Sequence, residues 1–378
     1  MKPVSRRTHS QDSKTTRPRK ASAPQAGGTA EGSSRARAAS GMKPNEEKLA
    51  GYLMARAATH QKVEGQDLTN LRVGNGTVQQ VHDLLPLGRA NVIEDLEKAP
   101  DAHLLERKTA ADKLTRKLME EVQSSKGEVT ESDFYRAAAA ASLHSKTGTC
   151  GSYSALSAPL HAFKIARMQD ESAIVAQAVH GTIDHGWTEM IPKGMGADGK
   201  PLLHDNDVIM DGWSKEHLAV LREDSQFARL DKEGKADQIT HKDVLNHRTG
   251  LEASNEVGRF KARIDSSMGL RHTYQKRLKL LVDANIEVQR DLLWNSTSIF
   301  HADFQKQAGM AVHPKAPAPE EGSSIQGARH EAEQAKRATL PEIQAVGVAR
   351  SLGEKIPGAV AKAPEIIASA KDMFPDPR

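Results

Sequence analysis

The chain of 378 residues contains a single cysteine, Cys150, in the sequence Gly148-Thr149-Cys150-Gly151. A nucleophilic cysteine needs a stabilised thiolate, a base within hydrogen-bond reach and a third group that holds the base. The glycines favour a sharp turn into a helix, and the partial positive charge at a helix N-terminus stabilises a thiolate. Backbone N–H groups of the same turn could also stabilise an oxyanion. Because a lone cysteine is more often a buried structural side chain, its partners decide the question.

Two candidate partners follow Cys150 along the chain. His185 lies in Ile-Asp-His-Gly-Trp-Thr-Glu, 35 residues after the cysteine, and Asp211 lies in Asp-Val-Ile-Met-Asp-Gly-Trp, 26 residues further on. A carboxylate that fixes the imidazole tautomer leaves the other ring nitrogen free to meet a thiol. Separately, His185 is typical of a hydrogen-bonded hairpin histidine and Asp211 of a turn residue. Together they favour a Cys-His-Asp triad, with Asp205 and Asp207 as rivals for the third position.

A helix and two neighbouring strands are needed to position these residues. Residues 183–191 and 207–213 are predicted strands, and 192–206, which contains three glycines and two prolines, is predicted to be the long loop of a hairpin. A helix is predicted to begin near Cys150 and to be kinked or broken around Pro159.

The predicted hairpin also sets which side chains meet. A loop centred near residue 199 pairs residues whose numbers add to about 398, so Asp211 faces Trp187 and lies diagonal to His185. Alternation along the strand places His185, Trp187 and Glu189 on one face. Trp187 is therefore expected to shield the histidine–carboxylate pair from water.

The chemistry expected from these residues is attack by the Cys150 thiolate on an amide or acyl carbon. His185 acts first as base and then as acid, and Asp211 orients it. The oxyanion is held by the Cys150 N–H and a second donor, for which Ser145 and Thr147 are candidates. Proteolysis, deamidation and amine transfer share this first step, and they differ in whether water or an amine resolves the acyl-enzyme.

Helices are predicted on both sides of this region. Apolar residues recur near helical spacing over 104–119, Thr130-Glu131-Ser132-Asp133 predicts the capped start of a helix over 130–143, and the chain from residue 215 is predicted to be helical, most clearly over 258–281 and 286–293. The predicted organisation is a disordered secretion leader (1–44), a helical N-terminal module (45–143), a catalytic thiol-enzyme core (144–312), and a linker with a weakly structured C-terminal tail (313–378).

Composition excludes several functional classes. Residues 1–40 carry nine Lys and Arg against two acidic residues, a charge of +7, whereas the whole chain has a formal net charge of +4. The body is therefore mildly acidic, and only 4% of the residues are aromatic, which argues against nucleic-acid binding. Apolar runs are too short for a transmembrane segment, and neither zinc-binding nor phosphate-binding motifs occur, so no metal or cofactor is predicted. One cysteine suits a reducing compartment.

The Cys-Gly at a helix start, the His-Gly-Trp-Thr-Glu segment and the Val-Ile-Met-Asp-Gly-Trp segment resemble the core of transglutaminase-like and papain-like thiol enzymes, over residues 148–213. With its Ser/Arg-rich leader and the helical region before the cysteine, the chain resembles the AvrPphE (HopX) family of type III secreted effectors from plant-pathogenic bacteria. The resemblance implies an α+β papain-like or transglutaminase-like fold with helical additions at both ends. It also implies a triad that maps onto Cys150, His185 and Asp211.

The same resemblance implies secretion by the type III secretion apparatus into the host cell cytoplasm and a host plant protein as substrate. The helical region before the cysteine would be a family-specific module for a host partner or cofactor. Some members begin with a Met-Gly acylation start, which the Met1-Lys2 start of this chain lacks. The alternative is a non-enzymatic effector whose fold is a scaffold that binds a host protein to suppress or trigger immunity. Alkylation of the thiol below pH 7 separates the two, because a scaffold cysteine should not react.

Overall fold

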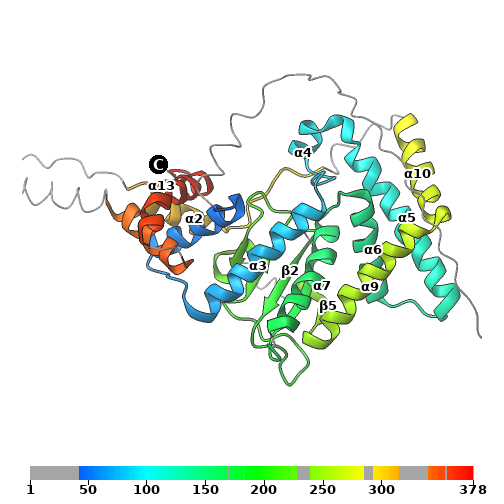
Figure 1. The fold of residues 1–378 in the computed structure, drawn as a ribbon, viewed down its shortest axis with the longest axis horizontal. Helices are drawn as coiled ribbons and strands as arrows, with labels where there is room; N and C mark the ends of the chain where they lie inside the picture. The colour runs from blue at the N-terminus through cyan, green and yellow to red at the C-terminus, as the bar shows by residue number, and fades with distance from the viewer. Residues whose placement is uncertain are drawn as a thin grey trace, which may run out of the picture. The chain divides into compact units, whose positions relative to one another are not determined.

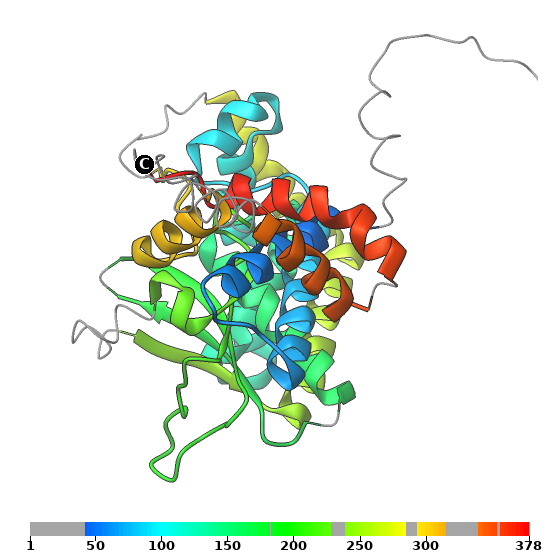
Figure 2. The same ribbon diagram turned by 90° about the vertical axis from the view of Figure 1, so that its left-hand side faces the viewer.

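The fold is α+β, as predicted, with helices packed against an antiparallel sheet (Figures 1 and 2). The computed structural model describes residues 42–168, 170–181, 183–227, 239–284, 293–314, 339–353 and 356–377. Its sheet has the strand order β4-β3-β2-β1-β5. The strands are β1 (Ile174–His180), β2 (His185–Ile191), β3 (Val208–Met210), β4 (Ala219–Leu221) and β5 (Ile239–Leu245).

The pairing of β2 with β3 has the predicted register. Thr188 faces Met210 and Glu189 faces Ile209, so the residue numbers of each pair add to 398. Both strands are shorter than predicted, because β2 begins at His185 and β3 ends one residue before Asp211. The candidate histidine and aspartate therefore lie at the same end of two adjacent strands.

The sheet is larger than the predicted hairpin. The region after residue 215, predicted to be helical, contains β4 and β5, so that prediction is wrong there. β1 is almost continuously apolar and buried, and such a run lacks the alternation that identifies a strand. β5 is a half-exposed edge strand whose pairing with β1 shifts register, and Asp243 within it has a positive φ of 48°.

Helices α3 (Gly65–Leu84) and α7 (Cys150–Met168) pack against the sheet (Figure 1). The Thr188 hydroxyl of β2 donates to the Ser154 carbonyl of α7 at 3.2 Å. A Cβ atom on Gly74 of α3 would lie 2.8 Å from the Val208 side chain, so only a glycine permits this approach. α7 runs through Pro159 as one helix, where a kink or break was the prediction.

Of two other predicted helices, one is confirmed and the other is divided into two helices. α6 (Glu131–Ser145) begins with the predicted capping box, in which the Thr130 hydroxyl accepts from the Asp133 N–H at 3.1 Å and the Asp133 carboxylate accepts from the Thr130 N–H at 3.0 Å. The helix predicted over 258–281 is instead two helices, α9 (His247–Ser266) and α10 (Met268–Asp283). The Ser267 hydroxyl accepts from the Leu270 N–H at 3.2 Å and so caps the second helix.

The remaining elements lie before and after the sheet region, except for one short helical turn between β4 and β5. They are α2 (Pro44–Ala58), α4 (Ile93–Lys98), η1 (Pro100–Ala102), α5 (Leu104–Lys126), η2 (Arg222–Asp224), α11 (Ala302–Val312) and α13 (Ile356–Met373). α5 and α6 pack together, and α9 packs against α6 and α7. Met42–Arg378 form one compact unit.

The C-terminal region contains a packed helix, which corrects the prediction of a weakly structured tail. α13 lies beside α2 (Figure 2). A Cβ atom on Gly51 of α2 would lie 2.8 Å from the Ala370 nitrogen of α13, and the Phe374 ring lies 4.8 Å from that of Phe300. The leader over residues 1–41, the linker over 315–338 and most of the helix predicted over 286–293 lie outside the described residues.

Candidate active site

Cys150 is the first residue of α7, and a backbone hydrogen bond holds the loop that leads into this helix. The Ala90 N–H donates to the Gly148 carbonyl at 2.8 Å, which holds this loop against the segment that follows α3. A Cβ atom on Gly148 would lie 2.4 Å from the Ser152 Cβ, so the turn requires glycine. Cys150 is half-buried and free, as expected for a thiol that must meet a substrate.

The start of α7 leaves backbone donors available beside the thiol. The Ser152 and Tyr153 N–H groups donate to the Thr149 carbonyl. Among the described residues, the N–H groups of Cys150 and Gly151 have no hydrogen-bond acceptor. These two groups are therefore available to donate hydrogen bonds to an oxyanion at the helix start.

The two side chains considered as second oxyanion donors are otherwise engaged. The Ser145 hydroxyl donates to backbone carbonyls of Ser142 and Thr147 at 3.1 and 3.0 Å. The Thr147 hydroxyl donates to the Gly88 carbonyl at 2.6 Å. Both hydroxyls therefore hold the loop that leads to the cysteine, a role that could not be predicted from the sequence because their acceptors are backbone atoms.

His185 and Asp211 are in direct contact at the end of β2 and β3. His185 Nε2 lies 2.9 Å from Asp211 Oδ2. The Trp213 backbone N–H donates to Asp211 Oδ1 at 3.0 Å, so the second carboxylate oxygen is also fixed. Only 7% of the histidine and 1% of the aspartate surface is exposed. The carboxylate therefore selects the tautomer that carries a proton on Nε2 and leaves Nδ1 for another partner.

The electrostatics of the site favour a protonated imidazole. Burial alone lowers the pKa of His185, but the charge of Asp211, its hydrogen bond and a side-chain hydrogen bond with Cys150 outweigh burial and raise the pKa to about 10. The structure thus brings all three predicted residues together. Cys150 Sγ also lies 3.9 Å from the carbonyl oxygen of Asp184, which has a positive φ of 44° where the chain enters β2.

The assignment of this site depends on its own geometry. No protein-family model, curated protein or solved structure matches the chain.

The two rival aspartates lie away from the histidine. Asp207 is fully buried and its carboxylate accepts from the His204 N–H at 2.8 Å and from Arg222 Nε at 3.3 Å. Burial raises the pKa of Asp207 to about 6, although its hydrogen bond from His204 and the charge of Arg222 oppose this. Asp205 is exposed and accepts from the Glu223 N–H through its backbone carbonyl.

Aromatic rings enclose the imidazole. His185 stacks on Phe227 at 5.7 Å and on Trp187 at 6.0 Å between ring centroids, and the tilted ring of Trp213 lies at 5.2 Å. Trp187 and Phe227 are themselves stacked at 3.9 Å with an interplanar angle of 6°. The predicted shielding by Trp187 is confirmed, and aromatic faces stabilise an imidazolium cation. Phe227 and Trp213 were not identified from the sequence as part of this enclosure.

Two histidines, one before and one after the cysteine, hold the turn that carries Asp211, and neither was identified from the sequence. His82 Nε2 and His217 Nδ1 donate to the Gly212 carbonyl at 2.7 and 3.1 Å. Burial lowers the pKa of His82 to about 4, and burial together with the neighbouring His82 ring lowers the pKa of His217 to about 2. Both rings are therefore neutral near pH 7. His82 and Gly212 are 130 residues apart, and no local pattern predicts such a contact.

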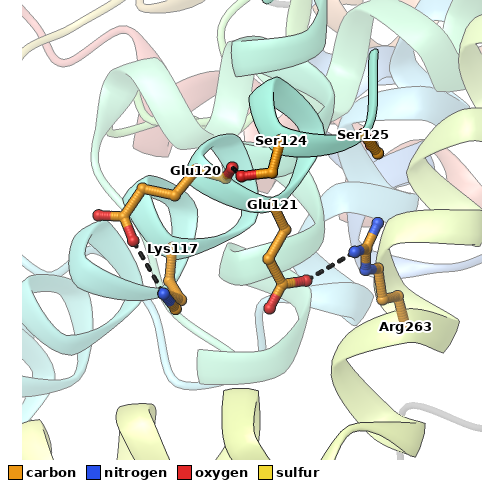
Figure 3. Close-up of a pocket in the computed structure, with 6 residues that line it drawn as sticks. All are labelled: Lys117, Glu120, Glu121, Ser124, Ser125 and Arg263. Atoms are coloured by element: carbon orange, nitrogen blue, oxygen red, sulfur yellow. Dashed lines mark hydrogen bonds and ion pairs between the residues drawn. The ribbon is translucent and has the colours of Figure 1, made fainter. Parts of the chain in front are cut away.

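Other candidate sites carry less chemistry. A polar pocket of about 430 Å³ is lined by Lys117, Glu120, Glu121, Ser124, Ser125 and Arg263, which belong to α5 and α9 (Figure 3). These helices carry none of the triad residues. No group of three or more His, Cys, Asp or Glu in the described part of the chain is arranged to hold a metal ion. No helix among the described residues is long and apolar enough to cross a membrane.

Proposed function

We propose that the chain is a thiol enzyme in which Cys150, His185 and Asp211 act as a catalytic triad. The observation that carries this proposal is the buried 2.9 Å contact between His185 Nε2 and Asp211 Oδ2, with Cys150 near enough to the same imidazole to help raise its pKa. A structural cysteine needs no imidazolium partner and no free N–H groups beside it. A nucleophile needs both.

In the first half of the reaction, the Cys150 thiolate attacks the carbonyl carbon of an amide. A C–S bond forms, and the oxyanion accepts hydrogen bonds from the N–H groups of Cys150 and Gly151. His185 then transfers its Nδ1 proton to the departing amine as the C–N bond breaks. Asp211 keeps its hydrogen bond to Nε2 and stabilises the imidazolium throughout.

In the second half, the acyl group leaves the sulfur. The neutral His185 takes a proton from water as the oxygen attacks the thioester carbon, and the C–S bond breaks to release a carboxylic acid. With a water nucleophile the net reaction is proteolysis or deamidation, and with an amine it is transglutaminase-like transfer. The enzyme class that we propose is therefore a cysteine-nucleophile hydrolase or acyl transferase acting on a protein.

The biological setting follows from the resemblance to the AvrPphE (HopX) family. We propose that the fold is of the papain-like or transglutaminase-like kind, and that the protein is a type III effector that acts on a host plant protein after secretion into the host cell cytoplasm. The segment before the cysteine contributes His82 and Arg89 to the surroundings of Asp211. This is a positioning role for the helical N-terminal module.

Thiol reactivity tests the enzyme proposal. Iodoacetamide at pH 6 should alkylate wild-type Cys150 faster than free cysteine, and intact mass should show one adduct because the chain has one thiol. His185→Asn should lose this excess rate while remaining folded. A wild-type rate equal to that of free cysteine would favour the non-enzymatic scaffold that binds a host protein.

Activity in the host tests the same residue. Cys150→Ala should abolish the effect of the protein in plant cells while its thermal stability stays at the wild-type level. A folded Cys150→Ala protein with full effect would contradict the enzyme proposal.

Delivery has a separate test. Deletion of residues 1–40 should change the stability of the purified protein by no more than a few tenths of a kcal/mol, because this segment has almost no large apolar side chains that could be buried. The same deletion should prevent export through the type III apparatus. Normal export of the truncated chain would contradict the effector assignment and leave the enzyme proposal intact.

A further inference from the structure

Beneath the aromatic wall of the site lies a buried carboxylate that the triad does not use. Glu189 in β2 has no exposed surface. Its Oε1 accepts from Trp187 Nε1 at 2.6 Å, and its Oε2 contacts His241 Nε2 at 2.8 Å and forms an ion pair with Arg222. Burial alone raises the pKa of Glu189, but the charge of Arg222 and the hydrogen bonds from His241 and Trp187 lower it to about 2. The side chain is therefore an anion near pH 7.

This anion fixes an indole that His185 needs. The Trp187 ring is stacked against Phe227 at 3.9 Å, and both rings are stacked against the imidazole with interplanar angles of 21° and 15°. The indole N–H points to Glu189, so rotation of the ring would break a short, charge-assisted hydrogen bond in a dry environment. The carboxylate thus holds the wall in the one orientation that covers His185.

We infer that Glu189 is a positioning residue of the candidate active site, acting on His185 through the Trp187 indole. This inference rests on the proposed function. The charged group in contact with the imidazole itself is Asp211, at 2.9 Å, and its attraction for the imidazolium is strong because the aromatic wall excludes water. Release of the indole would admit water, weaken that attraction and return the His185 pKa toward its ordinary value.

Glu189 also has a structural role that must be separated from this one. Arg222, at the end of β4, contacts Glu189 in β2 and Asp207 before β3, so the group joins three strands. Loss of the ion pair with Arg222 lowers the free energy of unfolding without altering the pKa of His185. Loss of the contact with Trp187 alters the pKa of His185.

The experiment compares four full-length chains: wild type, Glu189→Gln, Trp187→Phe and the double variant. Trp187→Phe keeps an aromatic ring but removes the N–H that Glu189 accepts. For each chain, the His185 pKa is measured by NMR and the rate of Cys150 alkylation by iodoacetamide is measured from pH 5 to 10. We expect each single variant to lower the His185 pKa by about one unit and the alkylation rate at pH 6 by about tenfold. The double variant should add little, because both changes act through one contact.

Thr188→Val is the matched control. Thr188 is fully buried in the same strand, but its hydroxyl donates to Ser154 on the helix-covered face. It should lower thermal stability and leave the titration of His185 at the wild-type value. If Glu189→Gln does not fold, Trp187→Phe alone still tests the contact.

The outcomes separate the two proposals. Variants that lose stability like Thr188→Val but keep the wild-type titration would overturn the positioning role of Glu189 alone. A wild-type thiol that reacts no faster than free cysteine at any pH would overturn the proposed function and this inference with it.

Discussion

Arg89 donates a hydrogen bond from its guanidinium to the backbone carbonyl of Trp213 at 3.1 Å. The same side chain forms a nearly buried ion pair with Asp95, and the next residue, Ala90, holds the Gly148 carbonyl. One short segment after α3 therefore touches both the loop that enters the cysteine helix and the turn that carries Asp211.

Replacement of Arg89 should loosen both sides of the site. Arg89→Met leaves the Asp95 carboxylate without its partner in a largely buried position, which costs about 3 kcal/mol of unfolding free energy. It should also slow alkylation of Cys150, because the two loops lose their common support. Urea unfolding and the alkylation rate measure the two effects. Lys108→Met, which removes a more exposed ion pair with Asp112, should change neither.

The two glycines that flank Cys150 should differ sharply. Gly148→Ala places a Cβ atom 2.4 Å from the Ser152 Cβ, so the start of α7 must shift at a cost of about 1–3 kcal/mol. Gly151→Ala meets no atom within 4 Å and should leave the free energy of unfolding unchanged or slightly higher. Chemical denaturation of both variants checks this. Equal free energies of unfolding for the two variants would mean that Gly148 does not approach Ser152 this closely.

The third member of the triad can be identified by two asparagine substitutions. Asp211→Asn keeps the shape of the site but favours the wrong imidazole tautomer, and the Ser-His-Asp template gives a loss of roughly 10⁴ in rate for such a change. Asp207→Asn should do much less, because its carboxylate contacts Arg222 and the His204 N–H. The pH dependence of Cys150 alkylation distinguishes them. A large loss in Asp207→Asn with none in Asp211→Asn would contradict the assignment.

The raised pKa of His185 predicts a pH-dependent stability. The ordinary value of 6.5 becomes about 10 in the folded chain, so the folded state binds the proton more tightly than the unfolded state. The stabilisation is complete below pH 6.5 and is lost as the pH rises toward 10, at up to about 1.4 kcal/mol for each pKa unit. Urea unfolding of the wild type from pH 6 to 10 should show this decline, and His185→Asn should show a flatter profile. Parallel profiles would mean that the imidazole is not held as a cation.

Local sequence patterns were sufficient to predict the β2–β3 hairpin, but they were insufficient to predict the elements and contacts around it. The β2–β3 register was predictable because Gly and Pro mark the loop and the apolar residues on either side define its centre. β1 was missed because Ile174–His180 is almost continuously apolar and lacks alternation, and the break between α9 and α10 depends on one serine cap. The contacts of Arg89 and His82 with the Asp211 turn join segments more than 120 residues apart, which no periodicity in a single sequence encodes.

The packing of α13 on α2 has a consequence for how the chain is made. About 300 residues separate these two helices, so the face of α2 that α13 covers has no partner until α13 has been synthesised. Contacts of such long sequence separation slow the folding reaction. The packing of α2 is therefore completed only after α13 has been synthesised, and a chain that lacks residues 354–378 should remain open at α2 and be digested there by protease.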